Sequence, residues 1–310
     1  HLIKLVNQKN IQIKAIFSPE HGFSGMHEAG ERIKNGIEPI TNVPIYSLYG
    51  KTRKPSSEML QHIDILLFDL QDIGVRYYTY LSTLTLVLEA AAENELQVIV
   101  LDRLNPLLRT VNGSVLDKKF SSFVGMHPLP VLHGMSLGEL AQMINGEGWL
   151  NNKHKTDLTI IPYEGKIEKD DLKGVFNPAP SPNMPNLETA WLYQGLCLVE
   201  GTNLSEGRGT NSPFKLIGAP WLNNKALKDE LEKNDNINNK YKVVEFTPKS
   251  VQSSKNPKYL NKKCQGLYIY SLVDPLTWTM KLFELVYKLH PDEFKFLESH
   301  FIDKLFGSNE

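Results

Sequence analysis

The sequence predicts an α/β protein, with a mainly parallel sheet in the first part of the chain and a second, smaller α+β region after it. In the first part, short apolar runs alternate with helical patterns, as in sheets whose parallel strands are joined by helices. The run from Ile65 to Phe68 is uninterrupted, which is typical of a strand buried on both faces. The 310 residues, 41% of them apolar, suffice for one large domain or two moderate ones.

Five strands and three helices are expected in the first part. The strands are IKAIFS (13–18), PIYSLY (44–49), DILLFDLQ (64–71), QVIVLD (97–102) and DLTIIPY (157–163). The helices are SSEMLQHI (56–63), the Leu- and Ala-rich segment 79–94, and residues 136–150. Ser136 and Glu139 have the spacing of a capping box, which favours a helix start at this point.

The pattern breaks after residue 165, where we place the boundary between a first domain, 1–165, and a second, 166–310. NPAPSPNMPN (177–186) holds four prolines in ten residues and cannot be the interior of a regular element. The second region contains a helix at 187–199, a polar Gly-rich loop at 200–214, a Lys/Asn-rich surface stretch at 223–242, strands at 243–246 and 266–272, and helices near 276–289 and 292–306. These elements predict a smaller α+β domain.

Composition argues against several classes of partner. The formal net charge is −1, so no charge-driven binding to nucleic acid or to an anionic membrane is expected. The apolar runs are far too short to span a bilayer. The two cysteines, Cys197 and Cys264, do not form a disulfide framework and do not have the spacing of zinc ligands. The chain begins at His1 without a signal peptide, which we interpret as trimming rather than as evidence for the cytoplasm.

Motifs for nucleotide and metal cofactors are absent. No G-x-G-x-x-G follows the first strand, and there is no Walker A loop and no G-x-S-x-G elbow. No HExxH, CxxC or DxD spacing is present. We therefore expect no cofactor and no metal. The alternative is a metal site that the fold assembles from His21, His27, Asp72, Asp102 and His133.

Ionisable side chains follow three of the predicted strands at the point where each strand ends. They are Glu20 and His21 after the first strand, Gln71, Asp72 and Arg76 after the third, and Asp102, Arg103 and Asn105 after the fourth. Because ligands of open α/β sheets bind outside the carboxyl ends of the strands, the three groups predict one cleft. For any single group, the alternative is a helix cap or a local ion pair.

Glu20 lies in the turn SPEHGFSG (18–25) that follows the first strand. A partly buried carboxyl group has its charged form disfavoured, which makes it usable as a general acid at neutral pH. The glycines of the turn permit left-handed backbone angles and close approach of a ligand. His21 can hold the proton, orient Glu20 or only close the turn. For Glu20 itself, the alternative is a cap of a helix or loop.

The stretch DIGVRYYTY (72–80) offers both a cation and aromatic rings. Arg76 has a planar fork that suits a carboxylate or a phosphate. Tyr78 and Tyr80 have faces that stack on sugar rings and hydroxyls that bind polar groups. The alternative is that part of this aromatic run is core at the start of the helix.

The stretch NLSEGRGT (203–210) places Glu206 and Arg208 in a Gly-flanked loop. An arginine between two glycines is accessible to a ligand that approaches the backbone, although a solvated hairpin tip has the same composition. His133 lies just before a predicted helix and is followed by a glycine. It lines the same cleft or is a structural histidine.

Several motifs run in a fixed order through the chain: SPEHGFSG, LYG followed by a basic stretch and PSSEML, FDLQDIGVRYYTY, VLDRLNP, HGMSLGELAQMINGEGW, PSPNMP and EGTNLSEGRGT. Together they resemble the exo-β-N-acetylmuramidase family called NamZ. The resemblance covers roughly residues 13 to 220 with high specificity, and the rest of the chain more loosely. No single motif decides it, and the ordered set does.

The resemblance implies a Rossmann-like catalytic domain and a smaller C-terminal auxiliary domain, with the active site between them. It implies a glycoside hydrolase that removes terminal N-acetylmuramic acid from the non-reducing ends of peptidoglycan fragments, such as muropeptides or disaccharides. Members of the family are exported, as periplasmic or secreted proteins, and serve cell-wall turnover. The family's candidate catalytic residue is the glutamate of Pro-Glu-His-Gly, which is Glu20 here. The oligomeric state is not implied.

Glycoside hydrolysis needs a general acid, here Glu20, and usually a second carboxylate, for which Asp72 and Glu206 are the candidates. Attack by the 2-acetamido group of the substrate, held by Asp72 or a tyrosine, is the alternative. We expect Arg76 and Arg208 to bind the lactyl carboxylate that distinguishes muramic acid from glucosamine. The other expected substrate contacts are His21, Tyr78, Tyr80, His133 and Asn183.

Two other functions compete with this interpretation. One is a metal-dependent hydrolase that uses His21, Asp72 and His133. The other is a non-catalytic protein that binds wall fragments, with Arg76 and Arg208 as clamps for carboxylates. Activity that survives a chelator counts against the first, and repeated turnover of a muramic acid glycoside counts against the second.

Overall fold

The computed structural model describes residues 11–308, except residues 26, 29, 32–33, 40, 108, 165–174, 177–178, 234–235 and 237. Within this part of the chain, no helix is long and apolar enough to cross a membrane. The expected break after residue 165 falls largely on residues outside the described set.

The first part of the chain holds three small sheets, and most of the strand pairings in them are parallel. The strands of the two larger sheets are β1 (Ile16–Ser18), β2 (Gly36–Ile37), β3 (Pro44–Ser47), β4 (Ile65–Phe68), β5 (Gln97–Leu101) and β8 (Asp157–Ile161). Strands β4, β5 and β8 are parallel neighbours in that order, and β3 pairs in parallel with β1 and antiparallel with β2. The mainly parallel α/β prediction is confirmed, although the described strands of this part form three sheets rather than one.

Helices α2 (Tyr80–Glu93) and α3 (Leu137–Gly146) pack against each other and against β5. Their apolar side chains form one hydrophobic core with the buried side chains of β4 and β5. At the start of α3, the Ser136 hydroxyl accepts a hydrogen bond from the Glu139 amide, and the Glu139 carboxylate accepts one from the Ser136 amide. The predicted capping box is therefore confirmed, and such a cap contributes about 1 kcal/mol to helix stability.

Strand β4 is buried on one face only, which corrects the expectation that both faces are covered. Leu66 and Phe68 point into the core and are buried, whereas Ile65 and Leu67 are 48% and 44% exposed. The alternation has a period of two, so one side of this short sheet packs on helices α2 and α3, whereas the side chains of Ile65 and Leu67 on the other side are exposed. An uninterrupted apolar run therefore did not distinguish a strand covered on both faces from one covered on a single face.

One predicted helix is replaced by turns, and another is shortened. Residues 57–62 form successive turns, and His62 adopts a left-handed backbone with φ 63°, which cannot continue a helix. Near the C-terminus, the predicted helix at 292–306 is helical only in α7 (Phe301–Phe306). Its N-cap, His300, is also left-handed, with φ 52°, so α7 is separated from the turns that precede it.

The second part of the chain is an antiparallel sheet with helices. Its elements are α4 (Leu187–Leu196), the 3₁₀ helix η4 (Cys197–Gly201), β9 (Leu216–Ala219), α5 (Asn224–Glu232), β10 (Lys240–Phe246), β11 (Cys264–Ser271) and α6 (Pro275–Leu289). Strand β11 lies between β10 and β9 and is antiparallel to both. Helix α5 corrects the expectation of a plain surface stretch at 223–242. The side chain of Asn223 caps α5 by accepting a hydrogen bond from the Ala226 amide.

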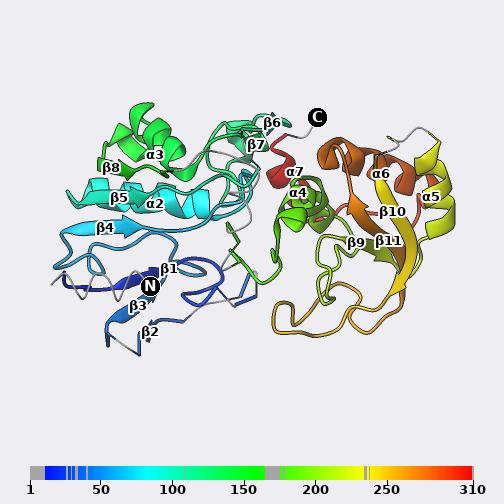
Figure 1. Cartoon of the computed structure of the whole chain (residues 1–310), viewed down its shortest axis with the longest axis horizontal. Coiled ribbons are helices and arrows are strands. Elements are labelled where there is room, and N and C mark those ends of the chain that lie inside the picture. The colour runs from blue at the N-terminus through cyan, green and yellow to red at the C-terminus, as the bar shows by residue number, and fades with distance from the viewer. Residues whose placement is uncertain are drawn as a thin grey trace.

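The segment of residues 73–80 connects the two parts of the molecule through a shared core. Ile73, Val75 and Tyr77 are buried in the same hydrophobic cluster as the side chains of α4 and α6. In Figure 1, α4 and α7 lie between the sheet β4–β5–β8 and the sheet β9–β11–β10. The smaller elements of the first part are β6 (Val111–Asn112), β7 (Leu132–His133), and the 3₁₀ helices η1 (Lys118–Phe120) and η2 (Asn151–Lys153).

Candidate active site

A pocket of about 570 Å³ is lined by residues from both parts of the chain. The first part contributes the Glu20 turn, the start of α2 and residues 122–124. The second part contributes the loop around Arg208 and residues 256–258, and α7 closes one side with Lys304 and Leu305. Six of the residues predicted from the sequence line this pocket: Glu20, His21, Tyr78, Asn183, Glu206 and Arg208.

Glu20 follows β1 directly and is buried. Its Oε1 accepts a hydrogen bond of 3.0 Å from the Gly30 amide, and its Oε2 accepts one of 2.7 Å from the Thr79 hydroxyl. Burial together with the negative charge of the nearby Glu20 carboxyl raises the pKa of Tyr49. Tyr49 therefore stays protonated at neutral pH, and the Glu20 carboxyl is oriented by two donors, the Gly30 amide and the Thr79 hydroxyl.

Thr79 is the N-cap residue of α2, but its side chain makes no capping hydrogen bond to that helix. A threonine hydroxyl at this position ordinarily bonds to an amide of the first helical turn and stabilises the helix by about 1 kcal/mol. Here the hydroxyl is directed to Glu20 instead. The start of α2 thus gives up a capping interaction while its hydroxyl holds the buried carboxyl group.

His21 forms the tight part of the turn. Its backbone is left-handed, with φ 72°, and Gly22 is left-handed as well, with φ 76°. A Cβ atom on Gly22 would lie 2.4 Å from the His27 ring, so only glycine fits there. The His21 Nδ1–H donates to the His27 carbonyl at 2.9 Å.

Burial lowers the pKa of His21 below its usual value, while the nearby Glu20 carboxyl opposes the change. The ring is therefore neutral at neutral pH. Because Nδ1 carries the hydrogen, Nε2 is an acceptor in this buried turn.

Tyr78 and Asn183 are two further predicted residues of the lining. Tyr78 is buried, and burial raises the pKa of its hydroxyl well above the usual range. Its ring packs edge-on against Tyr80, at a centroid distance of 5.0 Å. The Asn183 amide donates to the Ser253 carbonyl at 3.0 Å, which ties the proline-rich segment to the loop that follows β10.

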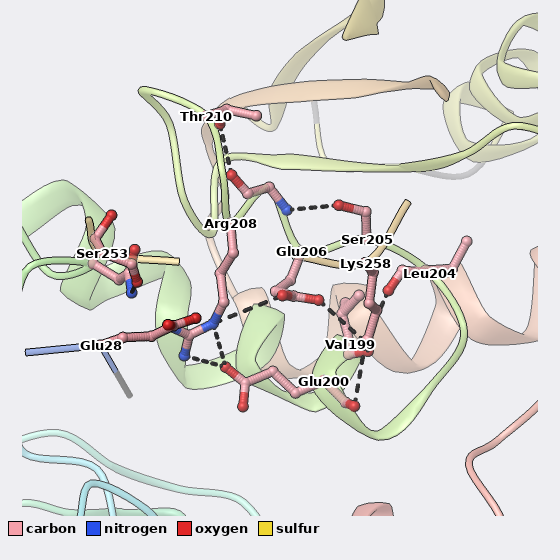
Figure 2. A network of polar contacts seen from close by, with 12 residues as sticks. Glu28, Val199, Glu200, Leu204, Ser205, Glu206, Arg208, Thr210, Ser253 and Lys258 are labelled. Atoms are coloured by element: carbon pink, nitrogen blue, oxygen red, sulfur yellow. Dashed lines mark hydrogen bonds and ion pairs between the residues drawn. The ribbon is translucent and has the colours of Figure 1, made fainter. Parts of the chain in front are cut away.

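Figure 2 shows the polar network around Arg208. The Arg208 guanidinium donates to Glu200 Oε1 at 2.7 Å and lies 3.7 Å from Glu206 Oε1. Lys258 lies 3.1 Å from Glu206 Oε2 and also donates to three backbone carbonyls. Burial disfavours the charged form of Arg208, but Glu200 and Glu206 outweigh burial and raise its pKa. Arg208 therefore lines the pocket as predicted, yet two glutamates already balance its charge.

Arg76 does not line the pocket, which argues against the substrate-binding role predicted for it. The side chain is 1% exposed. Its Nη1 donates to the carbonyls of Ser114 and Leu129, and its Nη2 to those of Leu305 and Phe306 at the end of α7. Burial lowers the pKa of Arg76 to about 10. The guanidinium is thus a buried clamp between backbone segments, with both terminal nitrogens already occupied.

Asp72, His133 and Tyr80 are also outside the pocket lining. The Asp72 Oδ2 accepts a hydrogen bond from the Gly74 amide and lies 3.7 Å from His133 Nε2. Both side chains are buried. The Tyr80 hydroxyl donates to the Pro180 carbonyl at 2.8 Å. The strand-end argument predicted Asp72 in the cleft, whereas the structure buries Asp72 outside the pocket lining.

The metal-site alternative is not supported by the geometry. His21 lines the pocket, whereas Asp72 and His133 are buried behind it, and Asp102 caps α3 through Ser136 and the Gly138 amide. In the described part of the chain, no three His, Cys, Asp or Glu side chains are grouped so that they would hold an ion.

Sequence reasoning missed several residues of the pocket, among them Tyr49, Arg53, Thr79, Phe123 and Lys258. Tyr49 and Arg53 follow β3, so the same strand-end argument that found Glu20 applies to them. Thr79 lies inside the stretch 72–80, in which the aromatic rings and Arg76 are the residues that the sequence marks as candidates. Phe123 and Lys258 come from irregular segments, and no local pattern marks them.

Two family descriptions together match nearly the whole chain. "Exo-beta-N-acetylmuramidase NamZ, N-terminal" matches residues 1–188, and the corresponding C-terminal description matches residues 191–310. The chain is also similar to the peptidoglycan β-N-acetylmuramidase NamZ of Bacillus subtilis (strain 168). The two are 38% identical over an alignment that covers 98% of this chain and 73% of the relative.

Two solved structures from Bacteroides fragilis NCTC 9343, both of DUF1343 family proteins, have a similar fold. One gives a TM-score of 0.79 at 36% identity and covers 100% of this chain and 79% of its own. The other gives a TM-score of 0.85 at 30% identity and covers 99% of this chain and 79% of its own. The mixed α/β architecture described above is therefore that of the DUF1343 proteins.

Proposed function

The chain belongs to the NamZ family of exo-β-N-acetylmuramidases, glycosidases that act on peptidoglycan, and we propose that Glu20 is the general acid of this reaction. The observation that carries the proposal is the position of the Glu20 carboxyl in the pocket, held by the Thr79 hydroxyl and the Gly30 amide. The substrate is the terminal N-acetylmuramic acid at the non-reducing end of a peptidoglycan fragment.

The hydrogen bonds of Glu20 suit a group that gives up and regains a proton. Departure of the leaving group requires a proton on the glycosidic oxygen, and in a retaining scheme the same group later takes a proton from water. The Thr79 hydroxyl can donate or accept a hydrogen bond. It can therefore hold the Glu20 carboxyl in place both before and after the proton is transferred.

Of the two candidates for a second carboxylate, Glu206 lines the pocket and Asp72 does not. The Glu206 oxygens lie beside Arg208 and Lys258, and this pairing stabilises a negative charge there. We therefore favour Glu206 over Asp72 for this role. In the substrate-assisted alternative, the Tyr78 hydroxyl would hold the acetamido group, because Tyr78 also lines the pocket.

We also propose that residues 1–165 form a Rossmann-like catalytic domain and residues 166–310 an auxiliary domain, with the active site between them. The parallel order β4–β5–β8 with α2 and α3, and a pocket lined from both parts, support this division. Because peptidoglycan lies outside the cytoplasmic membrane, we propose a periplasmic or secreted location and a role in wall turnover.

Replacement of Glu20 by Gln tests the assignment. Glu20→Gln keeps the shape of the side chain but cannot donate a carboxyl proton, so release of a phenol of high pKa from its muramic acid glycoside should fall at least about 100-fold. Circular dichroism and the thermal midpoint show whether the fold persists. Full activity in a folded Glu20→Gln protein would exclude the role.

A further inference from the structure

Four basic side chains line the pocket: Arg53, Arg208, Lys258 and Lys304. Arg208 is balanced by Glu200 and Glu206, and Lys258 by Glu206 and three carbonyls. Within the described residues, neither Arg53 nor Lys304 makes an ion pair or a side-chain hydrogen bond. Within the described residues, the positive charges of Arg53 and Lys304 are therefore not neutralised by a carboxylate.

The geometry singles out Arg53. Its Cζ lies 4.3 Å from the centroid of the Phe123 ring, so the guanidinium is stacked on an aromatic face. Stacking fixes the plane of a guanidinium and leaves the N–H groups at its edge free to bind a planar acceptor. Arg53 is exposed, and no carboxylate of the described chain occupies that edge.

Contacts connect this cation to the proposed general acid. The Phe123 ring lies 6.1 Å from the ring of Tyr49, measured between centroids, and the Glu20 carboxyl is near enough to the Tyr49 hydroxyl for its charge to raise the Tyr49 pKa. Arg53, Phe123, Tyr49 and Glu20 therefore form one continuous wall of the pocket. A sugar whose C1 is next to Glu20 would present its other substituents along this wall.

We propose that Arg53, stacked on Phe123, is the cation that recognises the lactyl carboxylate of the muramic acid residue. The proposal rests on the function proposed above and replaces Arg76 and Arg208 in that task. Muramic acid differs from glucosamine by this group, which is attached through O3 of the ring whose C1 is cleaved. A bidentate contact between arginine and carboxylate combines charge with geometric selection. Lys304 is the competing cation, but it has no aromatic support.

Ligand binding tests the proposal independently of catalysis. Isothermal titration would measure Kd for free N-acetylmuramic acid and for its neutral lactyl methylamide. We expect the unmodified protein to prefer the acid, and Arg53→Met to weaken binding of the acid about 10- to 100-fold while leaving the amide within about twofold. Arg53→Lys should retain part of the preference, because it keeps the charge but loses the fork.

Lys54→Met is the matched control, because it removes the same charge from the neighbouring residue. Lys54 pairs with Glu93 at 2.7 Å and does not line the pocket, so Lys54→Met should leave the Kd values for the acid and for the amide unchanged. The proposal is overturned if Arg53→Met weakens both ligands equally, if it affects neither, if Lys304→Met alone removes the preference, or if the unmodified protein binds acid and amide alike. If Glu20→Gln is fully active while Arg53→Met selectively loses the acid, the general-acid assignment fails and this subsite stands.

Discussion

The Thr79 hydroxyl lies 2.7 Å from Oε2 of Glu20, although Thr79 begins helix α2 and makes no capping bond to it. The residue that should stabilise the helix end therefore orients the carboxyl group instead. This relationship joins a residue at the start of a long helix to a residue that follows a strand 59 positions earlier in the chain. The Glu20 carboxyl is thus oriented in part by a hydroxyl group that lies outside its own turn.

Thr79→Val removes the hydroxyl and keeps the side-chain shape. We expect kcat/KM on a chromogenic muramic acid glycoside to fall about 10-fold, because one of the hydrogen bonds that orient Glu20 is lost. Thr79→Ser keeps the hydroxyl and should retain most of the activity. Unfolding in urea should show a smaller loss for Thr79→Val than the 1–2 kcal/mol that removal of a true threonine cap can cost. A stability loss of that size with unchanged kinetics would identify Thr79 as an ordinary cap.

Arg76→Met tests whether Arg76 is a clamp within the fold or a ligand for the substrate. The change leaves the carbonyls of Ser114, Leu129, Leu305 and Phe306 without their buried donor. We expect the free energy of unfolding to fall by about 3 kcal/mol or more, because buried carbonyls would lose their partners. Arg76→Lys should recover part of the lost free energy of unfolding. Normal stability combined with selective loss of binding to the free acid would restore the original assignment.

His127 should make the stability of the protein depend on pH. Burial, and to a smaller degree the charge of Lys118, lower the pKa of His127 to about 4, and its Nε2 bonds to the Thr85 hydroxyl at 2.9 Å. The unfolded chain, with a histidine pKa near 6.5, takes up this proton first. The contribution of the neutral ring is therefore complete above about pH 6.5 and is lost as the pH falls towards 4.

The matched variant for this prediction is His127→Gln, which keeps a polar group but does not titrate. The free energy of unfolding of the unmodified protein should fall more steeply than that of His127→Gln between pH 6.5 and pH 4, by up to about 3 kcal/mol. Urea unfolding at several pH values measures both slopes. Parallel slopes would show that His127 does not carry this dependence.

The sequence identified the Glu20 turn because a strand end exposes whatever follows it, and β1 ends at Ser18. The same argument failed for Asp72 and Arg76, since the chain that follows β4 enters the core shared with α4 and α6. Strand ends predict the edge of the sheet at which a side chain lies. They do not predict whether the chain then turns towards solvent or into the core.

Two other features depended on contacts that are distant in sequence. Arg76 donates hydrogen bonds to carbonyls 229 and 230 positions away in the sequence, and no local sequence pattern predicts such partners. Helix α2 was predictable from its composition, and α3 from its capping box, because both signals are local. Of the two glutamates that balance the charge of Arg208, Glu206 could be predicted because it is in the same loop. Glu200 could not, because it lies in the preceding 3₁₀ helix.

The most direct test of the central claim compares aryl glycosides of N-acetylmuramic acid whose leaving phenols have different pKa values. A general acid matters most when the leaving group is poor, because an acidic phenol departs without a proton. If Glu20 is the general acid, Glu20→Gln should lose at least about 100-fold in kcat/KM on a phenol of high pKa and much less on a dinitrophenol. An equal loss across the whole series would contradict the account.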